Sequence, residues 1–190
     1  MFNEALRLAE AAHSSVSRFR PTVDRFDPKG IHRIEHYRRR KSGTLYLLEK
    51  VLARNLITTT AKTQLLNTMF NALAQVAANS WFIGLVDLAG FTAFNASDTM
   101  ASHPGWVEWT NYSQSARPLW TQGTAASASI TNAAQVVFDM TATGTVHGLF
   151  VVTNSTKGGT TGLDWSGAPF TADVAVINGD QIRSTYTLSC

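Results

Sequence analysis

The stretch DVAVINGDQIRSTYTLS, residues 173–189, places two runs of alternating apolar and polar residues on either side of Asn178-Gly179-Asp180. Alternation with a period of two is typical of a β-strand that buries one face. An Asn-Gly-Asp sequence between two such runs favours a tight hairpin turn. The stretch therefore predicts an antiparallel β-hairpin and, with it, an antiparallel sheet.

Four more runs rich in β-branched and aromatic residues precede this hairpin, and each is bounded by Gly, Asn, Ser or Pro. They cover residues 81–87, 106–112, 127–142 and 145–154. No helical pattern separates them, so we expect a mainly β body that forms an antiparallel β-sandwich with jelly-roll-like connections. The glycine-rich residues 153–162 lack the spacing of a phosphate-binding loop and are expected to connect two strands.

One helix is predicted ahead of these strands. Thr58, Thr59 and Thr60 are suitable N-cap residues, and apolar residues recur at intervals of three and four over about residues 61–78. We expect this helix to pack its apolar face on the core. Residues 44–57, TLYLLEKVLARNLI, are apolar enough to pack as either helix or strand, so the body is predicted to span residues 44–190.

Charge divides the chain into two unlike parts. Residues 1–62 hold 13 of the 16 Lys and Arg against 6 of the 13 acids, whereas residues 63–190 hold 3 against 7. We interpret residues 1–43 as a basic N-terminal arm. Residues 2–16 have the pattern of a short amphipathic helix, which needs a partner surface because isolated helices of this length are marginal in water. Residues 17–31 are broken by prolines and predict an extended linker.

Two groups of residues are candidates for binding and for structural roles. The first group comprises the apolar and basic side chains of the arm, which we expect to contact a partner: Phe2, Leu6, Phe19, Arg20, Arg25, Phe26, Ile31, Arg33, Tyr37, Arg38, Arg39 and Arg40. The second group anchors the long connection 95–120 by burying aromatic surface, and it comprises Trp106, Trp109, Tyr112 and Trp120.

Catalytic and metal-binding patterns are weak. His32, Glu35 and His36 match H-x-x-E-H, which inverted zinc peptidases carry on a helix. The match lies in a basic segment with no further acidic ligand pattern, so we expect a solvated stretch, no metal, no cofactor and no enzyme activity. The arginine run can contact nucleic-acid phosphates or an acidic protein surface. A protein surface is favoured because the body shows no recognisable nucleic-acid-binding fold.

The remaining features bear on the location of the protein. No window approaches 18 uninterrupted apolar residues, so no membrane contact is expected. The single cysteine, Cys190, excludes an intramolecular disulfide and is interpreted as a free thiol. These features are typical of a protein that is made and assembled in a cytosol.

Several short segments follow one another in a recognisable order over about residues 55–190. They are 55–62 (NLITTTAK), 81–86 (WFIGLV), 96–103 (ASDTMASH), 105–106 (GW), Tyr112, 117–120 (RPLW), 155–160 (STKGGT), 178–180 (NGD) and 185–188 (TYTL). In this order they resemble a family of small virion structural proteins of tailed bacteriophages. Residues 1–54 lie outside the resemblance, and no catalytic residue follows from it.

The resemblance implies a virion component, and we expect a capsid cement or decoration protein. Such a protein bridges neighbouring subunits of the major capsid protein at the capsid surface after assembly in the host cytoplasm, and we expect it to self-associate as a dimer or trimer. The alternative is a tail, baseplate or fibre-associated protein whose β body binds a receptor.

Overall fold

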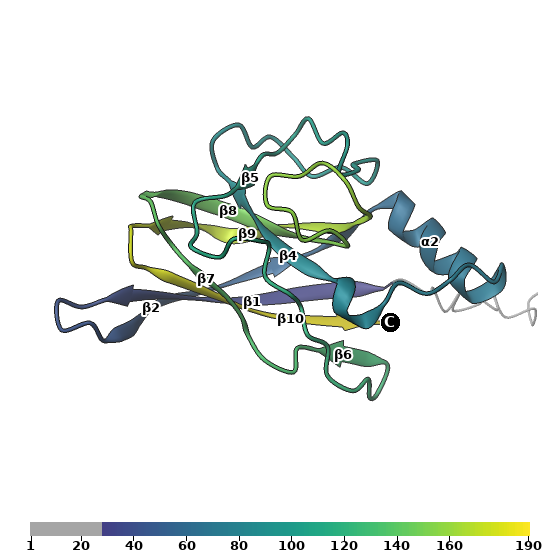
Figure 1. Ribbon diagram of the computed structural model, residues 1–190, viewed down its shortest axis with the longest axis horizontal. Helices are drawn as coiled ribbons and strands as arrows, with labels where there is room; N and C mark the ends of the chain where they lie inside the picture. Colours follow the sequence, from purple (N-terminus) through teal and green to yellow (C-terminus); the bar gives the residue numbers. More distant parts are fainter. Residues whose placement is uncertain (1–27) are drawn as a thin grey trace, which may run out of the picture.

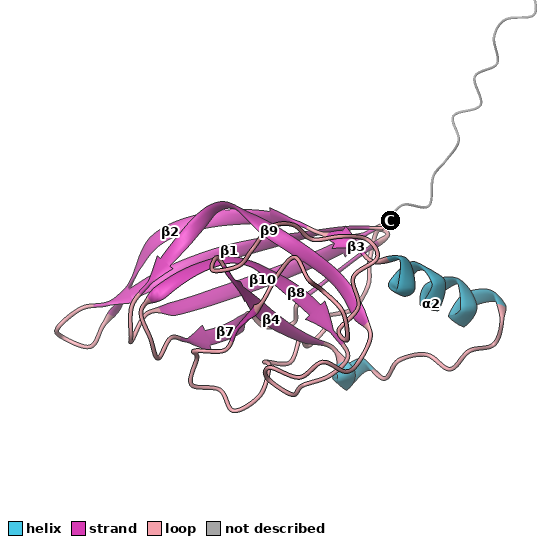
Figure 2. Cartoon of the chain, turned by 90° about the horizontal axis from the view of Figure 1, so that it is seen from above, coloured by secondary structure: helices cyan, strands magenta, loops and turns pink. Residues whose placement is uncertain are grey.

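The computed structural model describes residues 28–190, which form a mainly β structure with one longer helix (Figures 1 and 2). The strands are β1 (Lys29–Arg39), β2 (Leu45–Arg54), β3 (Leu56–Ile57), β4 (Phe82–Asp87), β5 (Glu108–Trp109), β6 (Ser129–Thr131), β7 (Val136–Asp139), β8 (Gly144–Val152), β9 (Asp164–Val176) and β10 (Gln181–Ser189). The helices are α2 (Thr59–Phe70) and the short 3-10 helix η1 (Ala78–Ser80). None of the helices in this range is long and apolar enough to cross a membrane.

The strands form a curled antiparallel sheet in the order β5-β4-β8-β9-β2-β1-β10-β6, with β3 also paired to β9 and β7 to β10. The two halves of the sheet are joined at one paired position, Ala53 of β2 opposite Phe170 of β9. The mainly β, antiparallel fold predicted from the sequence is confirmed. The jelly-roll connectivity stays a prediction.

The core lies inside the curl of the sheet. Ile34, Ile182 and Tyr186 from β1 and β10 belong to the same buried cluster as Leu85 and Leu149 from β4 and β8. Both halves of the sheet therefore contribute to one core, which is compatible with the predicted sandwich, and the sandwich itself also stays a prediction. The β9–β10 hairpin predicted from residues 173–189 is present, and Gly179 supplies the positive φ of its turn, which a side chain would disfavour.

The N-terminal strands correct one prediction. Residues 29–39, which the sequence analysis assigned to the arm, form β1, and β1 pairs with both β2 and β10 near the middle of the sheet. Residues 44–57, left open between helix and strand, are mostly strand. The arm predicted over residues 1–43 was therefore too long, because β1 takes part in the sheet by hydrogen bonding along its whole length. Residues 1–27 lie outside the described residues.

The helix α2 also differs from its prediction. It ends at Phe70 rather than near residue 78, and Ala72 has a positive φ that interrupts the helical path. Its start is fixed by Thr58, whose side chain accepts a hydrogen bond from the backbone of Ala61 and donates one to the carbonyl of Asp164. Ala61 is buried and Leu65 packs partly buried against the core, whereas Leu66, Met69 and Phe70 are exposed, so only part of the predicted apolar face packs on the core. Figure 2 shows α2 and the segment after it standing off from the sheet.

Candidate interaction surfaces

The outer side of β1, β2 and β10 carries a cluster of positive charge. Along each strand, every second side chain points away from the core. On this outer side of the sheet lie Arg33 and Arg39 of β1, Lys50 and Arg54 of β2, and Arg183 of β10. We call this surface the basic face and define it by these five cations with Glu35, Tyr37, Leu47 and Leu52. Leu47 and Leu52 are exposed to 41% and 43%. The basic face therefore combines cations with apolar and aromatic side chains.

The single carboxylate of the basic face is already paired. Lys50 Nζ lies 2.7 Å from Glu35 Oε1, and the hydroxyl of Tyr37 donates to Glu35 at 2.8 Å. These hydrogen bonds, first of all the one from Lys50, lower the pKa of Glu35 to about 2. Arg183 lies over the Tyr37 ring at 4.4 Å. Among residues 28–190, no carboxylate lies within ion-pair distance of Arg33 or Arg54, so their charges face solvent.

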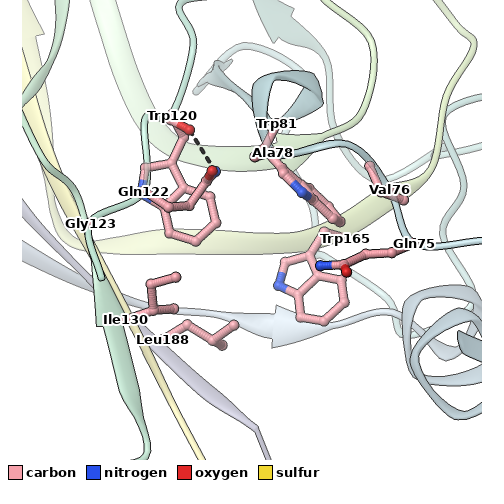
Figure 3. Close-up of a pocket in the computed structure, with 10 residues that line it drawn as sticks. All are labelled: Gln75, Val76, Ala78, Trp81, Trp120, Gln122, Gly123, Ile130, Trp165 and Leu188. Carbon is pink, nitrogen blue, oxygen red and sulfur yellow. Dashed lines mark hydrogen bonds between the residues drawn. The ribbon is translucent and has the colours of Figure 1, made fainter. Parts of the chain in front are cut away.

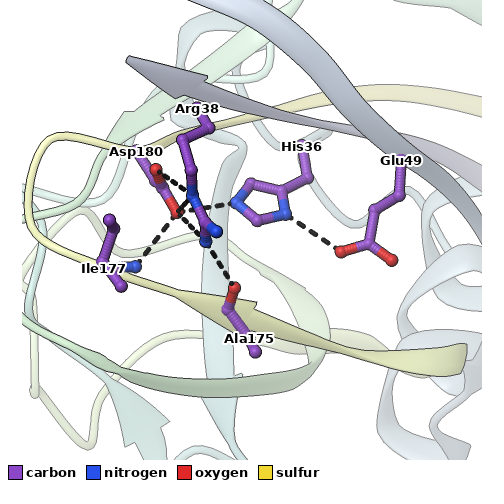
Figure 4. A network of polar contacts seen from close by, with 6 residues as sticks. All are labelled: His36, Arg38, Glu49, Ala175, Ile177 and Asp180. Carbon is purple, nitrogen blue, oxygen red and sulfur yellow. Dashed lines mark hydrogen bonds and ion pairs between the residues drawn. The ribbon is translucent and has the colours of Figure 1, made fainter. Parts of the chain in front are cut away.

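Arg38 was predicted to bind a partner, but it lies on the other side of β1. Its guanidinium contacts Asp180, with Arg38 Nη2 2.9 Å from Asp180 Oδ2 (Figure 4). His36 Nε2 lies 2.9 Å from the same oxygen, and His36 Nδ1 lies 3.0 Å from Glu49 Oε1. The backbone of Ile177 also donates to Asp180 at 3.0 Å. The network thus ties β1 and β2 to the turn between β9 and β10.

The electrostatics of this network favour an ionised Asp180. Burial by itself would raise the pKa of Asp180, but the hydrogen bonds from Arg38 and His36 outweigh it and hold the pKa below its ordinary value. The His36 imidazole lies between two carboxylates, and the Arg38 guanidinium binds one of them, Asp180. These charged hydrogen bonds form a structural connection between strands. Successive side chains of β1 point to opposite faces of the sheet, which explains why Arg38 joins this network while the neighbouring Arg39 lies on the outer side.

The H-x-x-E-H match does not form a metal site. On a strand, its two histidines point inward while Glu35 points outward, so the three side chains do not meet. His32 is fully buried, stacks on Tyr186 with ring centroids 4.0 Å apart, and has a pKa lowered to about 3 by burial. The expectation of a solvated stretch was therefore wrong for both histidines. Within the described part of the chain, no group of three or more His, Cys, Asp or Glu is placed to hold a metal ion.

The outer side of β4, β8 and β9 is covered by residues 88–107, which we call the aromatic cover. Figure 1 shows this segment on the side of β8 and β9 that faces away from β1 and β10. Trp106 packs on Phe150 of β8, and its indole nitrogen donates to Asp98 at 3.1 Å. Phe94 lies directly on Gly167 of β9, where a side chain would collide with its ring. All four predicted anchors are buried, but only Trp106 lies in this outer cluster, and Trp109, Tyr112 and Trp120 belong to the main core.

A buried ion pair, which the sequence did not reveal, follows directly after the aromatic cover and begins with Glu108 of β5. Arg117 Nη2 lies 2.8 Å from Glu108 Oε2, and both side chains are almost completely buried. Arg117 also donates to the carbonyls of Asn154 and Gly159. The pair therefore connects the segment after the cover to the loop between β8 and β9.

An apolar groove lies between α2 and the sheet, and we call it the Trp81 groove. It consists of two adjoining cavities of about 400 and 350 Å³ that share Gln75, Val76, Trp81 and Trp165. The cavity in Figure 3 continues past Trp120 to Ile130 and Leu188, and the other cavity is bounded by Leu65 and Met69 of α2. Trp81 and Trp165 meet edge to face with centroids 5.6 Å apart. The groove offers apolar walls with amide groups at its rim.

The predicted partner-binding residues fall into three groups in the structure. Phe2, Leu6, Phe19, Arg20, Arg25 and Phe26 lie outside the described residues. Ile31, Arg33, Tyr37 and Arg39 line the outer side of β1, and Arg40 follows β1 and lies over the Tyr46 ring at 4.9 Å. Arg38 is engaged on the inner side. Sequence reasoning missed Lys50, Arg54 and Arg183 because only strand pairing brings them beside Arg33.

Comparisons with known proteins add no relative. No protein-family model matches the chain, and no curated protein sequence matches it significantly. The basic face and the Trp81 groove are therefore the observations on which a functional proposal can rest.

Proposed function

We propose that this chain is a non-enzymatic structural protein of a tailed-bacteriophage virion, and specifically a capsid cement or decoration protein. The observation that supports this proposal most directly is the basic face, where five cations and one paired carboxylate share an exposed sheet surface. The resemblance of residues 55–190 to small virion proteins of such phages supports the same role. A cement protein binds a repeated lattice, so modest contacts are multiplied by their number.

The partner that fits the basic face is an acidic protein surface, which we propose to be part of the major capsid protein. Exposed cations such as Arg33 and Arg54 steer association with a negatively charged surface. Leu47, Leu52 and Tyr37 add apolar contact at the same place. The basic residues Arg20 and Arg25, which precede β1 in sequence, are proposed to extend this contact.

Self-association as a dimer or trimer belongs to the same proposal. The exposed apolar residues of α2 and the segment after it, Leu66, Met69, Phe70 and Leu73, give the body apolar surface that an assembly can bury. We propose that the protein resides at the capsid surface of a virion assembled in the host cytoplasm.

The first test is the copy number of the chain in purified particles by quantitative mass spectrometry. The proposal expects hundreds of copies in a fixed ratio to the major capsid protein. A few to a few dozen copies would overturn the cement role.

The second test measures binding of the full chain to particles that lack it, as a function of salt. Arg33→Glu is expected to weaken binding about ten-fold or more, because it reverses one charge that faces the acidic partner. Thr156→Glu combined with Thr160→Glu is the matched control, since it changes the net charge by the same two units at exposed positions of the loop between β8 and β9, away from the basic face, and should bind like the wild type. Equal binding by both variants would refute the role of the basic face.

The alternative role is a tail, baseplate or fibre-associated protein with a receptor-binding body. The observation that favours it is the Trp81 groove, because aromatic walls beside the amides of Gln75 and Gln122 suit a sugar ring. Saturable quenching of tryptophan fluorescence by host surface glycans, together with a low copy number, would replace the cement role by this one.

A further inference from the structure

The Trp81 groove is an apolar surface that the described residues leave partly open. Met69 of α2 lines it and is 57% exposed, and Val76 and Trp81 on the opposite wall are half-buried. Helix α2 is attached to the sheet mainly at its first turn, through Thr58 and Ala61. A helix with so little buried surface is stabilised by any apolar partner that fills the space between it and the sheet.

The chain itself has a segment of fitting chemistry next to the groove. Twenty-seven residues precede Pro28, and residues 2–16 carry an amphipathic pattern with Phe2, Leu6 and Ala9 near one face. The described chain begins beside α2, since Pro28 and Lys62 of α2 line one common hollow. Residues 17–27 between this point and the segment are long enough to span roughly 35 Å.

We propose that residues 2–16 bind in the Trp81 groove of their own chain, with Phe2 and Leu6 between Met69 and the Trp81–Trp165 pair. Tethering through eleven residues gives the segment an effective concentration of about millimolar at the groove, so weak apolar contacts are enough to hold it there. Gln64 and Gln75 at the rim can pair with the polar face of the segment. This inference goes beyond the proposed function and holds whether or not the protein belongs to a virion.

The test uses the full chain with Cys190→Ser, which removes the exposed native thiol, and a pair of introduced cysteines. Ala5→Cys with Gln75→Cys leaves Phe2 and Leu6 in place and is expected to form an intrachain disulfide under mild oxidation, about ten-fold faster than the control pair because docking concentrates the two thiols. The control pair is Ala5→Cys with Ser42→Cys, and Ser42 lies in the exposed turn at the far end of β1. Peptide mapping identifies the bonds, and non-reducing electrophoresis separates monomers from dimers.

Two further variants of the crosslinking pair distinguish docking from random collision. Phe2→Asp adds a charge to the apolar face and should reduce crosslinking to the rate of the control pair. Asn3→Asp adds the same charge beside it, on a residue that is already polar, and should leave the rate unchanged. Equal rates for the Gln75 and Ser42 pairs, or equal effects of the two Asp variants, would refute the proposal. Crosslinked dimers in place of intrachain bonds would also overturn it, because the occupant would then be a second copy.

Discussion

The two outer surfaces of the curled sheet differ in what lies on them. On β4 and β8, residues of both faces are buried, because Ile83 and Leu85 face the core while Val86 and Phe150 face the aromatic cover. On β1, burial alternates, and the outward residues include the exposed Arg33 and Arg39 beside the half-buried Glu35 and Tyr37. One half of the sheet thus carries its own covering layer, and the described residues provide none for the other half. An exposed sheet face of this kind is where a binding partner can add contact.

The largest effect on stability is expected from a substitution that disrupts the packing of the aromatic cover. Trp106→Ala removes a fully buried indole and should lower the free energy of unfolding by about 3–5 kcal/mol, because it leaves a cavity and takes one of two hydrogen bonds from Asp98. Urea denaturation followed by circular dichroism measures the change. Val107→Ala, at a position that is 55% exposed, is the matched control and should cost far less. Similar losses for both variants would mean that the cover is not part of the cooperative core.

The next effect tests the network inside the uncovered half. Asp180→Asn should lower the free energy of unfolding by about 2 kcal/mol at neutral pH, since Arg38 and His36 lose their shared carboxylate. The lowered pKa of Asp180 sets the pH dependence. Its contribution is complete above the ordinary carboxyl pKa of 3.8 and is lost as pH falls through the lower folded-state pKa.

The measurement for this network compares wild type and Asp180→Asn in urea at neutral and at acid pH. The difference between them should shrink at acid pH, where the wild-type carboxylate is also neutral. Asp173→Asn serves as the control, because this side chain is 43% exposed and pairs with His147 at the surface. A difference that persists at acid pH would contradict the electrostatic explanation.

A smaller effect is expected in the covered half, where stability should change with pH in the opposite direction. Burial, followed by the charge of Asp98 in the aromatic cover, raises the pKa of Asp164 to about 7. The folded state then binds more protons than the unfolded state between the ordinary carboxyl value of 3.8 and about 7, so stability should fall as pH rises through this range. The expected loss is about 1–2 kcal/mol between about pH 5 and pH 7.

Asp164→Asn should remove this dependence, and denaturant titrations over the same pH range measure it. The variant keeps the shape of the side chain and the hydrogen bond from Thr58 to the backbone carbonyl of residue 164. An unchanged pH slope would show that Asp164 is ionised in the folded protein near neutral pH. Glu35 on the basic face provides the contrast in the uncovered half, because its pKa is lowered whereas that of Asp164 is raised.

The smallest effect is expected on the basic face itself. Arg33→Ala should change the free energy of unfolding by no more than about 0.5 kcal/mol, since the side chain is exposed and unpaired with any described carboxylate. A thermal melt with a salt series detects a larger change. A loss comparable to that of Asp180→Asn would mean that the face serves the fold rather than a partner.

Sequence reasoning found the elements whose pattern matches their environment. The hairpin of residues 173–189 alternates strictly around a glycine turn, so its two strands were readable. Strand β1 was missed because His32 and His36 occupy two of its inward positions, and histidine does not mark a buried face as Ile34 does. The longer helix was predicted from apolar periodicity, but α2 ends where Ala72 leaves the helical conformation.

The candidate site was predicted only in part, since it depends on which strands lie side by side. Arg33 belongs to the basic run seen in the sequence, but Arg183 comes from the opposite end of the chain and joins it through β1–β10 pairing. The Trp81 groove likewise combines Trp81, Trp165 and α2, which no spacing rule connects. Pairing across such distances is decided by packing of the whole sheet rather than by local pattern.

The pairing of β1 with β10 also has a consequence for the order of folding. Lys29 pairs with Ser189, so the sheet cannot close around its core until almost all residues between them have been synthesised. Contacts of such long sequence separation slow folding, because loop-closure entropy is lost before they form. During synthesis, β1 and β2 can pair as a local hairpin, with the apolar positions Ile34 and Val51 unburied. When overexpression produces chains faster than their sheets close, we therefore expect aggregation through β1 and β2.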